Sequence, residues 1–197
     1  MGFFAWSAPL FGRYGDRWSP ETVARYRDWL RPHVPPGGSV LDLGGGTGAL
    51  ARRLAETLEC RVTVLDPTPE MVVQMEPHER VTAVIGSAEA MPFENATFDA
   101  LVISDAFHHF RDQEGAAREI ARVVRPAGGV LVLEFDPSGW MRLVVLGEKL
   151  LGEPGAFFTP AEACAFFSRF GIEGHCEHEP GGRTKYYFLG TVARPRA

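Results

Sequence analysis

One stretch of this 197-residue chain constrains its fold more than any other, the glycine-rich segment VLDLGGGTGAL at residues 40–50. An apolar run there carries an acid, Asp42, near its end, and four glycines follow within residues 44–48. A helical pattern then begins at Leu50. Because glycine has no Cβ, such a loop can adopt positive φ and let a ligand approach the backbone. A buried strand, a tight loop and a helix N-terminus in this order are typical of a nucleotide-binding βα turn.

The loop alone fits two ligands. Gly44-x-Gly46-x-x-Ala49 satisfies the relaxed dinucleotide fingerprint, whereas Gly44-x-Gly46-x-Gly48 satisfies the fingerprint for S-adenosylmethionine (SAM). A glycine-rich turn without any ligand is a third interpretation, and the acid at the strand end disfavours it. The choice between the two ligands therefore depends on the rest of the chain.

Composition excludes several classes of function. The net charge is -5 and no basic run is present, which disfavours a nucleic-acid partner. Cys60, Cys164 and Cys176 are widely spaced and odd in number, so they predict no disulfide framework and favour a reducing cytosol. No apolar run approaches the roughly 20 residues that span a bilayer, and the first residues lack a basic signal region. We expect a soluble, cytoplasmic protein without stable membrane anchoring; its oligomeric state cannot be read from the sequence.

A second apolar run, residues 61–66, also ends on an acid. Asp66 follows Gly44 by 22 residues, the separation at which a βαβ unit places a carboxylate beside a ribose. A carboxylate can accept hydrogen bonds from both ribose hydroxyls at once. Asp66 is therefore a candidate ribose ligand.

The remaining apolar runs alternate with helical patterns. Strands are expected at 81–86, 98–104 and 130–135, with a helix at 114–124, and a hairpin at 171–193 turns at Pro180-Gly181-Gly182. This pattern predicts an α/β fold, a doubly wound Rossmann-like sheet of seven strands that is mostly parallel and has a C-terminal antiparallel hairpin strand. The length fits a single domain over residues 1–197.

Two segments lie outside that alternation. Residues 1–35 are rich in aromatics and include a helix expected from the Ser19 cap to about Leu30, so they are interpreted as an N-terminal helical cap. Residues 136–158 form an insertion with an apolar helical stretch. This insertion is a candidate lid over an apolar substrate, and packing into the core explains it equally well.

At this point the chain resembles the class I SAM-dependent methyltransferases, closest to the small-molecule branch that includes the ubiquinone/menaquinone C-methyltransferases. Five stretches in order carry the resemblance: VLDLGGGTG (40–48), VLDPTPEM (64–71), GSAEAMPF (86–93), FDALVISDAFHHF (98–110) and EIARVVRPAGGVLVLE (119–134). Two positions depart from the family pattern. Ser87 stands where an aspartate often contacts the adenine amino group, and the turn Pro126–Gly129 is one residue longer than the common Pro-Gly-Gly.

The resemblance implies SAM as cofactor, S-adenosylhomocysteine (SAH) as product and a set of contacts at the carboxyl ends of the strands. For the methionine part, the implied contacts are the backbone of Gly44, Gly45 and Gly46, the carboxylate of Asp42 near the amino group, and Ser104 and Asp105 beside the tail. Asp66 would bind the ribose. Pro67 would lie beside the adenine, and Ala88 would donate its backbone N–H to it, with Ser87 and Glu89 adjacent. Acids suit this ligand because it carries a sulfonium and an ammonium.

His108 and His109 follow the fourth strand and are the candidate catalytic residues. A base is needed only if the acceptor carries a proton that must be removed, and histidine suits that task near neutral pH. The alternative is that one histidine has a structural role and the other faces solvent. His175, Cys176 and His178 lie close together in the sequence. On a strand, however, Cys176 and His178 share a face while His175 points away, and no fourth ligand is evident, so no metal site is expected.

The function that these patterns favour is methyl transfer from SAM to a small, hydrophobic or aromatic acceptor. A SAM-binding sensor or assembly subunit without catalysis is an alternative, because an intact glycine loop serves binding as well as reaction. An NAD(P)-dependent oxidoreductase is a weaker alternative, since the dinucleotide interpretation gives no reason for the four later motifs.

Overall fold

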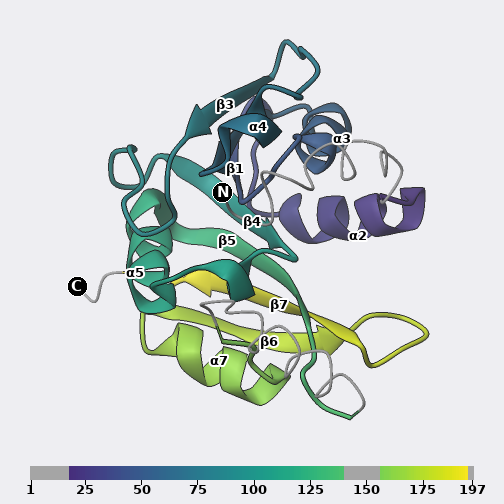
Figure 1. The fold of residues 1–197 in the computed structure, drawn as a ribbon, viewed down its shortest axis with the longest axis vertical. Coiled ribbons are helices and arrows are strands. Elements are labelled where there is room, and N and C mark those ends of the chain that lie inside the picture. The colour runs from purple at the N-terminus through teal and green to yellow at the C-terminus, as the bar shows by residue number, and fades with distance from the viewer. Residues whose placement is uncertain (1–17, 140–155, 195–197) are drawn as a thin grey trace.

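The computed structural model describes residues 18–139 and 156–194. A seven-stranded sheet runs through the centre of this part of the chain, with helices on both of its faces (Figure 1). The first 17 residues of the expected aromatic cap and residues 140–155 of the expected insertion lie outside the described residues.

The sheet has the strand order β3-β2-β1-β4-β5-β7-β6. Its strands are β1 (Ser39–Leu43), β2 (Arg61–Asp66), β3 (Val81–Ile85), β4 (Phe98–Ser104), β5 (Val124–Phe135), β6 (Ile172–His178) and β7 (Lys185–Val192). Strands β1 to β5 pair in parallel, and β7 runs antiparallel to both of its neighbours, β5 and β6. The doubly wound, mostly parallel sheet with an antiparallel C-terminal hairpin strand is therefore confirmed.

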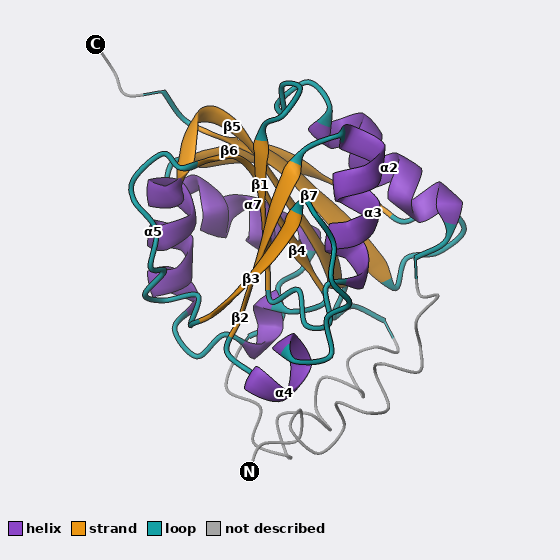
Figure 2. Ribbon diagram, turned by 90° about the horizontal axis from the view of Figure 1, so that it is seen from above, coloured by secondary structure: helices purple, strands orange, loops and turns teal. Residues whose placement is uncertain are grey.

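Helices cover the two faces of the sheet in pairs, α2 with α3 and α5 with α7 (Figure 2). The helical elements are α2 (Pro20–Leu30), α3 (Ala49–Leu58), α4 (Pro69–Val72), the 3-10 turn η1 (Phe107–His109), α5 (Gln113–Val123) and α7 (Pro160–Ser168). Local sequence sets several boundaries. The Ser19 hydroxyl accepts the N–H of Thr22, and Thr159 forms a capping box with Glu162, each followed by proline at the first helical position.

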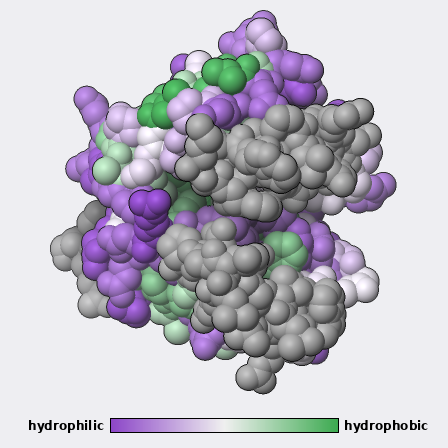
Figure 3. Space-filling model, viewed as in Figure 1, coloured by the Kyte–Doolittle hydropathy of each residue, from purple (hydrophilic) through white to green (hydrophobic). Residues whose placement is uncertain are grey.

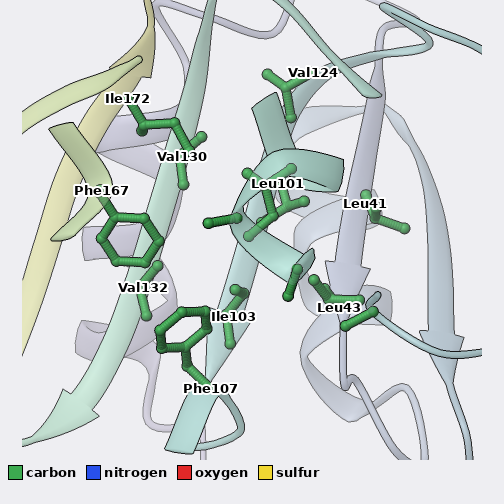
Figure 4. Close-up of a cluster of buried hydrophobic side chains, with 14 of the residues drawn as sticks. Leu41, Leu43, Leu101, Ile103, Phe107, Val124, Val130, Val132, Phe167 and Ile172 are labelled. Carbon is green, nitrogen blue, oxygen red and sulfur yellow. The ribbon is translucent and has the colours of Figure 1, made fainter. Parts of the chain in front are cut away.

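Two apolar clusters form the core, one on each face of the sheet. The larger lies between the sheet and the helices α5 and α7, and Figure 4 shows Ile103 and Val132 next to Phe107, with Phe167 beside Val132. The smaller lies under α2 and α3, where Tyr26 and Leu54 are fully buried. Strands β1, β4 and β5 contribute to both clusters, which is why their sequences are continuously apolar.

Large exposed apolar side chains are few on the described surface. Val73 is 78% exposed and Ile85 is 54% exposed. They belong to the end of α4 and to the edge strand β3, the region where hydrophobic colour gathers at the top of Figure 3. Among the described residues, no helix is long and apolar enough to cross a membrane.

The junction between α5 and β5 differs from the expected one. The helix ends at Val123 and the strand begins at the next residue, so Pro126–Gly129 lies inside β5 instead of forming a turn before it. Val124 pairs with Phe98 and Gly129 pairs with Ala100, which leaves four residues of β5 opposite Asp99 alone. These four residues, 125–128, form a bulge in β5. Within it Ala127 has φ 65°, and Arg125 at its start forms an ion pair with Asp99.

The cysteines are closer together than their spacing in the chain suggested. The Sγ atoms of Cys164 on α7 and Cys176 on β6 lie 3.2 Å apart, both as free thiols. Their proximity follows from the packing of α7 against β6, a tertiary contact that cysteine spacing does not encode.

Candidate functional site

The parallel strands β1, β2, β4 and β5 end at the same edge of the sheet. Leu43 pairs with Leu65, and Ser104 pairs with Leu133, so the residues that follow each strand enter the same region. Open α/β sheets bind ligands at this carboxyl edge. Asp42, Asp66, Ser104 and Asp105, expected from the sequence to form a site, all lie there.

The glycine loop between β1 and α3 depends on glycine at specific positions. Gly44, Gly46 and Gly48 all have positive φ, and α3 begins directly after Gly48. At Gly45 the constraint is space instead, because a Cβ there would lie 2.6 Å from the Asp42 carboxyl carbon. A Cβ on Gly46 would meet nothing within 4 Å. The loop therefore presents bare backbone on its open side while it packs closely on Asp42.

Asp66 holds this loop to the end of β2. Its Oδ2 accepts the Gly46 N–H at 2.9 Å, and its Oδ1 accepts the Thr68 N–H at 2.8 Å. Each carboxylate oxygen has more than one lone pair, so both can accept further bonds from a ligand. Asp66 lies beside the glycine loop, where the sequence predicts the ribose.

Asp42 is buried and incompletely satisfied. Its side chain is 1% exposed, and its Oδ2 has no hydrogen-bond partner among the described residues. Burial raises the pKa of Asp42 to about 7, and the nearby negative charge of Asp66 adds to the shift. A cation bound beside Asp42 would relieve both effects.

The residues at the end of β4 contact two other elements, α2 and β7. The Ser104 hydroxyl is 2.8 Å from the hydroxyl of the buried Tyr26 on α2. Asp105 has φ 52°, and its Oδ2 accepts a bond from Lys185 Nζ at 2.6 Å. Lys185 Nζ also lies 4.4 Å from the centroid of the Phe135 ring. Both predicted residues thus lie at the expected edge, with side chains that also contact α2 and β7.

The predicted adenine contacts follow β2 and β3. Pro67 is exposed beside Asp66, and Ala88 is 6% exposed and belongs to the larger core cluster. Glu89 turns toward α5, where its Oε1 accepts the N–H groups of Arg111 and Asp112 at 3.2 and 3.3 Å. Ser87 accepts the N–H of Ala90 through its carbonyl.

His108 is buried against a carboxylate. Its Nδ1 lies 2.7 Å from Glu134 Oε2 at the end of β5, and the two side chains are 5% and 6% exposed. Glu134 Oε1 also accepts the N–H of Phe107 at 2.8 Å, and Oε2 accepts that of Phe135 at 3.2 Å. Backbone N–H groups donate to both oxygens of Glu134, so the His108 tautomer that carries its proton on Nδ1 and donates it to Glu134 fits this arrangement best. In the neutral ring the lone pair then resides on Nε2.

Two rings, those of Phe157 and His109, pack against the imidazole of His108. Phe157 stacks on His108 with ring centroids 4.4 Å apart and an interplanar angle of 19°. The ring centroid of His109 lies 3.9 Å from that of His108. Gln113 fixes the segment that carries Phe157: its Nε2 donates to the carbonyl oxygens of Phe107 and Ala156, and its Oε1 accepts the Ala156 N–H. His108 is thus held in one orientation, whereas His109 is only half-buried.

These residues fit SAM. The Asp42 Oδ2, which no described residue hydrogen-bonds, suits the ammonium of the methionine part. The bare backbone at Gly46 admits a ligand at close range. Asp66 at the end of β2 offers acceptors for ribose hydroxyls. A pyrophosphate would bring its own negative charge next to the buried carboxyl group of Asp42, so this acceptor favours a cationic ligand.

The His175–His178 segment does not assemble a metal site in the described residues. His178 Nε2 lies 2.8 Å from Asp136 Oδ2, and His175 Nε2 lies 3.2 Å from Glu177 Oε1. No group of three metal-binding side chains occurs in residues 18–139 and 156–194.

Sequence reasoning missed four side chains at this edge: Tyr26, Glu134, Phe157 and Lys185. For Glu134 a signal was present, because it ends an apolar strand on an acid as Asp42 and Asp66 do. Tyr26 lies within the helix expected up to about Leu30, and no local pattern indicates that its hydroxyl meets Ser104. Lys185 and Phe157 reach the site through tertiary contacts, which no local pattern reports.

Comparison with known proteins agrees with this geometry. Residues 41–133 match the protein family described as a methyltransferase domain. The ubiquinone/menaquinone biosynthesis C-methyltransferase of Rubrivivax gelatinosus is 40% identical over 120 residues, which cover 59% of this chain and 47% of that protein. The chain thus spans about half the length of the relative it matches.

Solved structures share the fold. One chain of the Haloferax volcanii complex between the Trm112 methyltransferase activator and a methyltransferase superposes with a TM-score of 0.80 at 19% identity, covering 99% of this chain and 97% of that one. Human N-acetylserotonin methyltransferase in complex with SAM superposes with a TM-score of 0.72 at 20% identity, covering 96% of this chain and 57% of that one. Motif order, sheet topology and the family match agree: the chain carries a class I SAM-dependent methyltransferase domain.

Proposed function

We propose that this protein transfers the methyl group of SAM to a small hydrophobic or aromatic acceptor, with His108 as the base. The observation that carries the proposal is the buried His108–Glu134 pair at the same sheet edge as the glycine loop. The relative's name, a C-methyltransferase of ubiquinone and menaquinone biosynthesis, supports an aromatic acceptor for this chain as well.

The cofactor-side residues have the task of alignment. SAM supplies a methyl group on a sulfonium, and transfer requires that nucleophile, methyl and sulfur lie in line. The Gly44–Gly46 backbone and the carboxylates of Asp42 and Asp66 would fix the donor relative to the sheet. The two acids also counter the positive charge of the ligand in a region that excludes water.

The acceptor-side residues have the task of proton removal. With Nδ1 donating to Glu134, His108 can accept a proton only at Nε2. Glu134 stabilises the imidazolium that forms, because the carboxylate is already present at 2.7 Å and needs no rearrangement. Phe157 covers one face of the ring, which favours an apolar or aromatic acceptor next to it.

Binding is tested first, by isothermal titration with SAM, SAH and NAD. We expect binding of SAM and SAH and none of NAD. NAD binding without SAM binding would refute the cofactor assignment.

Catalysis is tested by transfer of radiolabelled methyl groups from SAM to a panel of phenols, hydroquinones and, for contrast, hydrophilic amines. We expect incorporation into the aromatic members, and we expect His108→Gln to lower the rate by roughly 10²–10⁴-fold while SAH affinity stays unchanged. His109→Gln is the matched control and should lower the rate much less. SAM binding without transfer to any member would instead favour a sensor or assembly role.

A further inference from the structure

The segment between β3 and β4 has no regular secondary structure, yet its backbone is tied to one side chain of α5. Arg122 Nη1 donates to the carbonyl oxygen of Phe93 at 2.7 Å and to Asn95 Oδ1 at 3.1 Å. Its Nη2 donates to the carbonyl oxygen of Met91 at 3.1 Å. A single guanidinium thus bonds three points of the segment, which a flat fork of five donors allows and an ammonium does not.

A carboxylate one turn earlier on α5 completes this arrangement. Glu119 receives two parallel bonds from Arg122, Nε to Oε1 at 2.6 Å and Nη2 to Oε2 at 2.7 Å. Its Oε2 also accepts the Met91 N–H at 2.7 Å. The Arg122 bond lowers the pKa of Glu119, so the pair stays charged at neutral pH. Met91 is therefore held through both its N–H and its carbonyl.

The start of the same segment is fixed by a second attachment to α5. Glu89 Oε1 accepts the N–H groups of Arg111 and Asp112, just before the first turn of the helix. Ala88 and Met91 are both buried, at 6% and 5% exposure. Residues 88–95 thus have little freedom to move, although no helix or strand contains them.

We propose that Arg122, paired with Glu119, is a positioning residue for recognition of the cofactor's adenine. The proposal rests on the proposed function and on the adenine position that the family resemblance implies, beside Ser87, Ala88 and Glu89. With Ser87 in place of an acid, the base must be read largely by the backbone of this segment, so the position of that backbone determines the selectivity. Arg122 does not touch the ligand; it acts by holding residues 91–95 at a fixed distance from α5.

The experiment measures both the affinity for the ligand and the selectivity for its nucleobase, adenine. SAH and S-inosylhomocysteine, in which the adenine amino group is replaced by a carbonyl, are titrated into wild type and Arg122→Lys by calorimetry. Wild type should prefer SAH. Arg122→Lys should bind SAH roughly tenfold more weakly, as expected for lost hydrogen bonds, and the ratio of the two affinities should fall toward one.

Matched variants separate positioning from general stability. Arg118→Lys makes the same change one turn away, in an exposed pair with Glu114 at 3.1 Å, and should leave both affinities unchanged. Glu119→Gln keeps the side-chain shape and should give an intermediate loss of selectivity, which also covers the case in which Arg122→Lys folds poorly. Thermal unfolding of each variant reports the folded fraction.

The outcomes distinguish two failures. If Arg122→Lys and Glu119→Gln lower both affinities by the same factor, or change neither, Arg122 supports the fold alone and the inference is wrong. The inference also fails if wild type binds SAH and S-inosylhomocysteine equally well. If wild type binds no SAH at all, the proposed function itself is refuted.

Discussion

Asp42 and Glu134 are both buried carboxylates at the carboxyl edge of the sheet, with 1% and 5% of their surface exposed. Around Glu134, backbone N–H groups and His108 supply donors to both oxygens. At Asp42, Oδ2 has no partner among the described residues, and burial raises its pKa to about 7. Buried polar groups are usually satisfied. The difference therefore fits a Glu134 that the protein itself satisfies and an Asp42 that, in the proposed function, bonds the ammonium of the ligand.

Replacement of Asp42 tests this comparison with the largest expected effect. The pKa of Asp42 in the folded protein, about 7, exceeds the roughly 3.9 of an unfolded aspartate. Between those values the folded protein keeps a proton that the unfolded chain releases, so stability should fall as pH rises, by about 4 kcal/mol in total, and then level off above pH 7. Asp42→Asn should remove this slope in urea unfolding of the ligand-free protein.

The same substitution has a second readout in binding. A bound ammonium favours the ionised carboxylate, so SAH affinity of wild type should decrease below pH 7, by at most tenfold per pH unit. Asp42→Asn should bind SAH more weakly with little dependence on pH between 5.5 and 7.5. Parallel pH profiles for wild type and variant would show that Asp42 is satisfied by the protein and not by the ligand.

Glu134→Gln should destabilise the folded protein, because Glu134 is already hydrogen-bonded within it. Its amide N–H₂ would face the donors that the carboxylate now accepts, so we expect a loss of about 2–3 kcal/mol in urea unfolding at pH 7.5. The control is Glu173→Gln, since Glu173 is exposed on β6 and accepts a bond from Ser168 at 2.8 Å. Equal losses at both positions would contradict the view that Glu134 is unusually well satisfied.

Asp66 should fall between these extremes, because it bonds the protein and would also bond the ligand. Asp66→Ala should weaken SAH binding by roughly 1.5–3 kcal/mol in calorimetry, since ribose contacts are lost and Gly46 loses its acceptor. Glu70→Ala, an exposed acid in the first turn of α4, serves as the control. Unchanged affinity in Asp66→Ala would rule out the ribose assignment.

The smallest expected effect sets the scale for the others. Thr159→Ala removes the capping box of α7 and touches none of the residues proposed to bind the cofactor, so it should cost only about 1 kcal/mol in urea unfolding. SAH affinity should stay the same. A loss as large as that for Glu134→Gln would mean that the buried carboxylate contributes no more than an ordinary helix cap.

The fold was largely predictable because its signals are local. Apolar runs bounded by glycine, proline and strand-end acids define β1, β2 and β4, and their alternation with helices leaves few topologies. Asp42 and Asp66 were predictable for the same reason, since each belongs to a strand end within a recognisable motif. Ser19 and Thr159 likewise indicate the start of α2 and α7, because a hydroxyl cap followed by proline is a pattern of adjacent residues.

The acceptor side was less predictable because it depends on contacts between distant segments. His108 was a candidate, but its partner lies 26 residues further along the chain on a neighbouring strand. The contacts of Phe157 with His108, and of Cys164 with Cys176, likewise arise from packing between elements. Pairing across a sheet sets these positions, and composition or periodicity of either segment alone cannot report it.

The bulge in β5 has a consequence for how such chains can change length during evolution. A residue inserted within a strand reverses the facing of every side chain beyond it, which here would turn Glu134 away from His108. Residues 125–128 lie opposite Asp99 alone, so an added or deleted residue there changes the size of the bulge and leaves the pairing from Gly129 onward intact. The extra residue in Pro126–Gly129 is thus accommodated where an insertion does not disturb the chemistry at the far end of the strand.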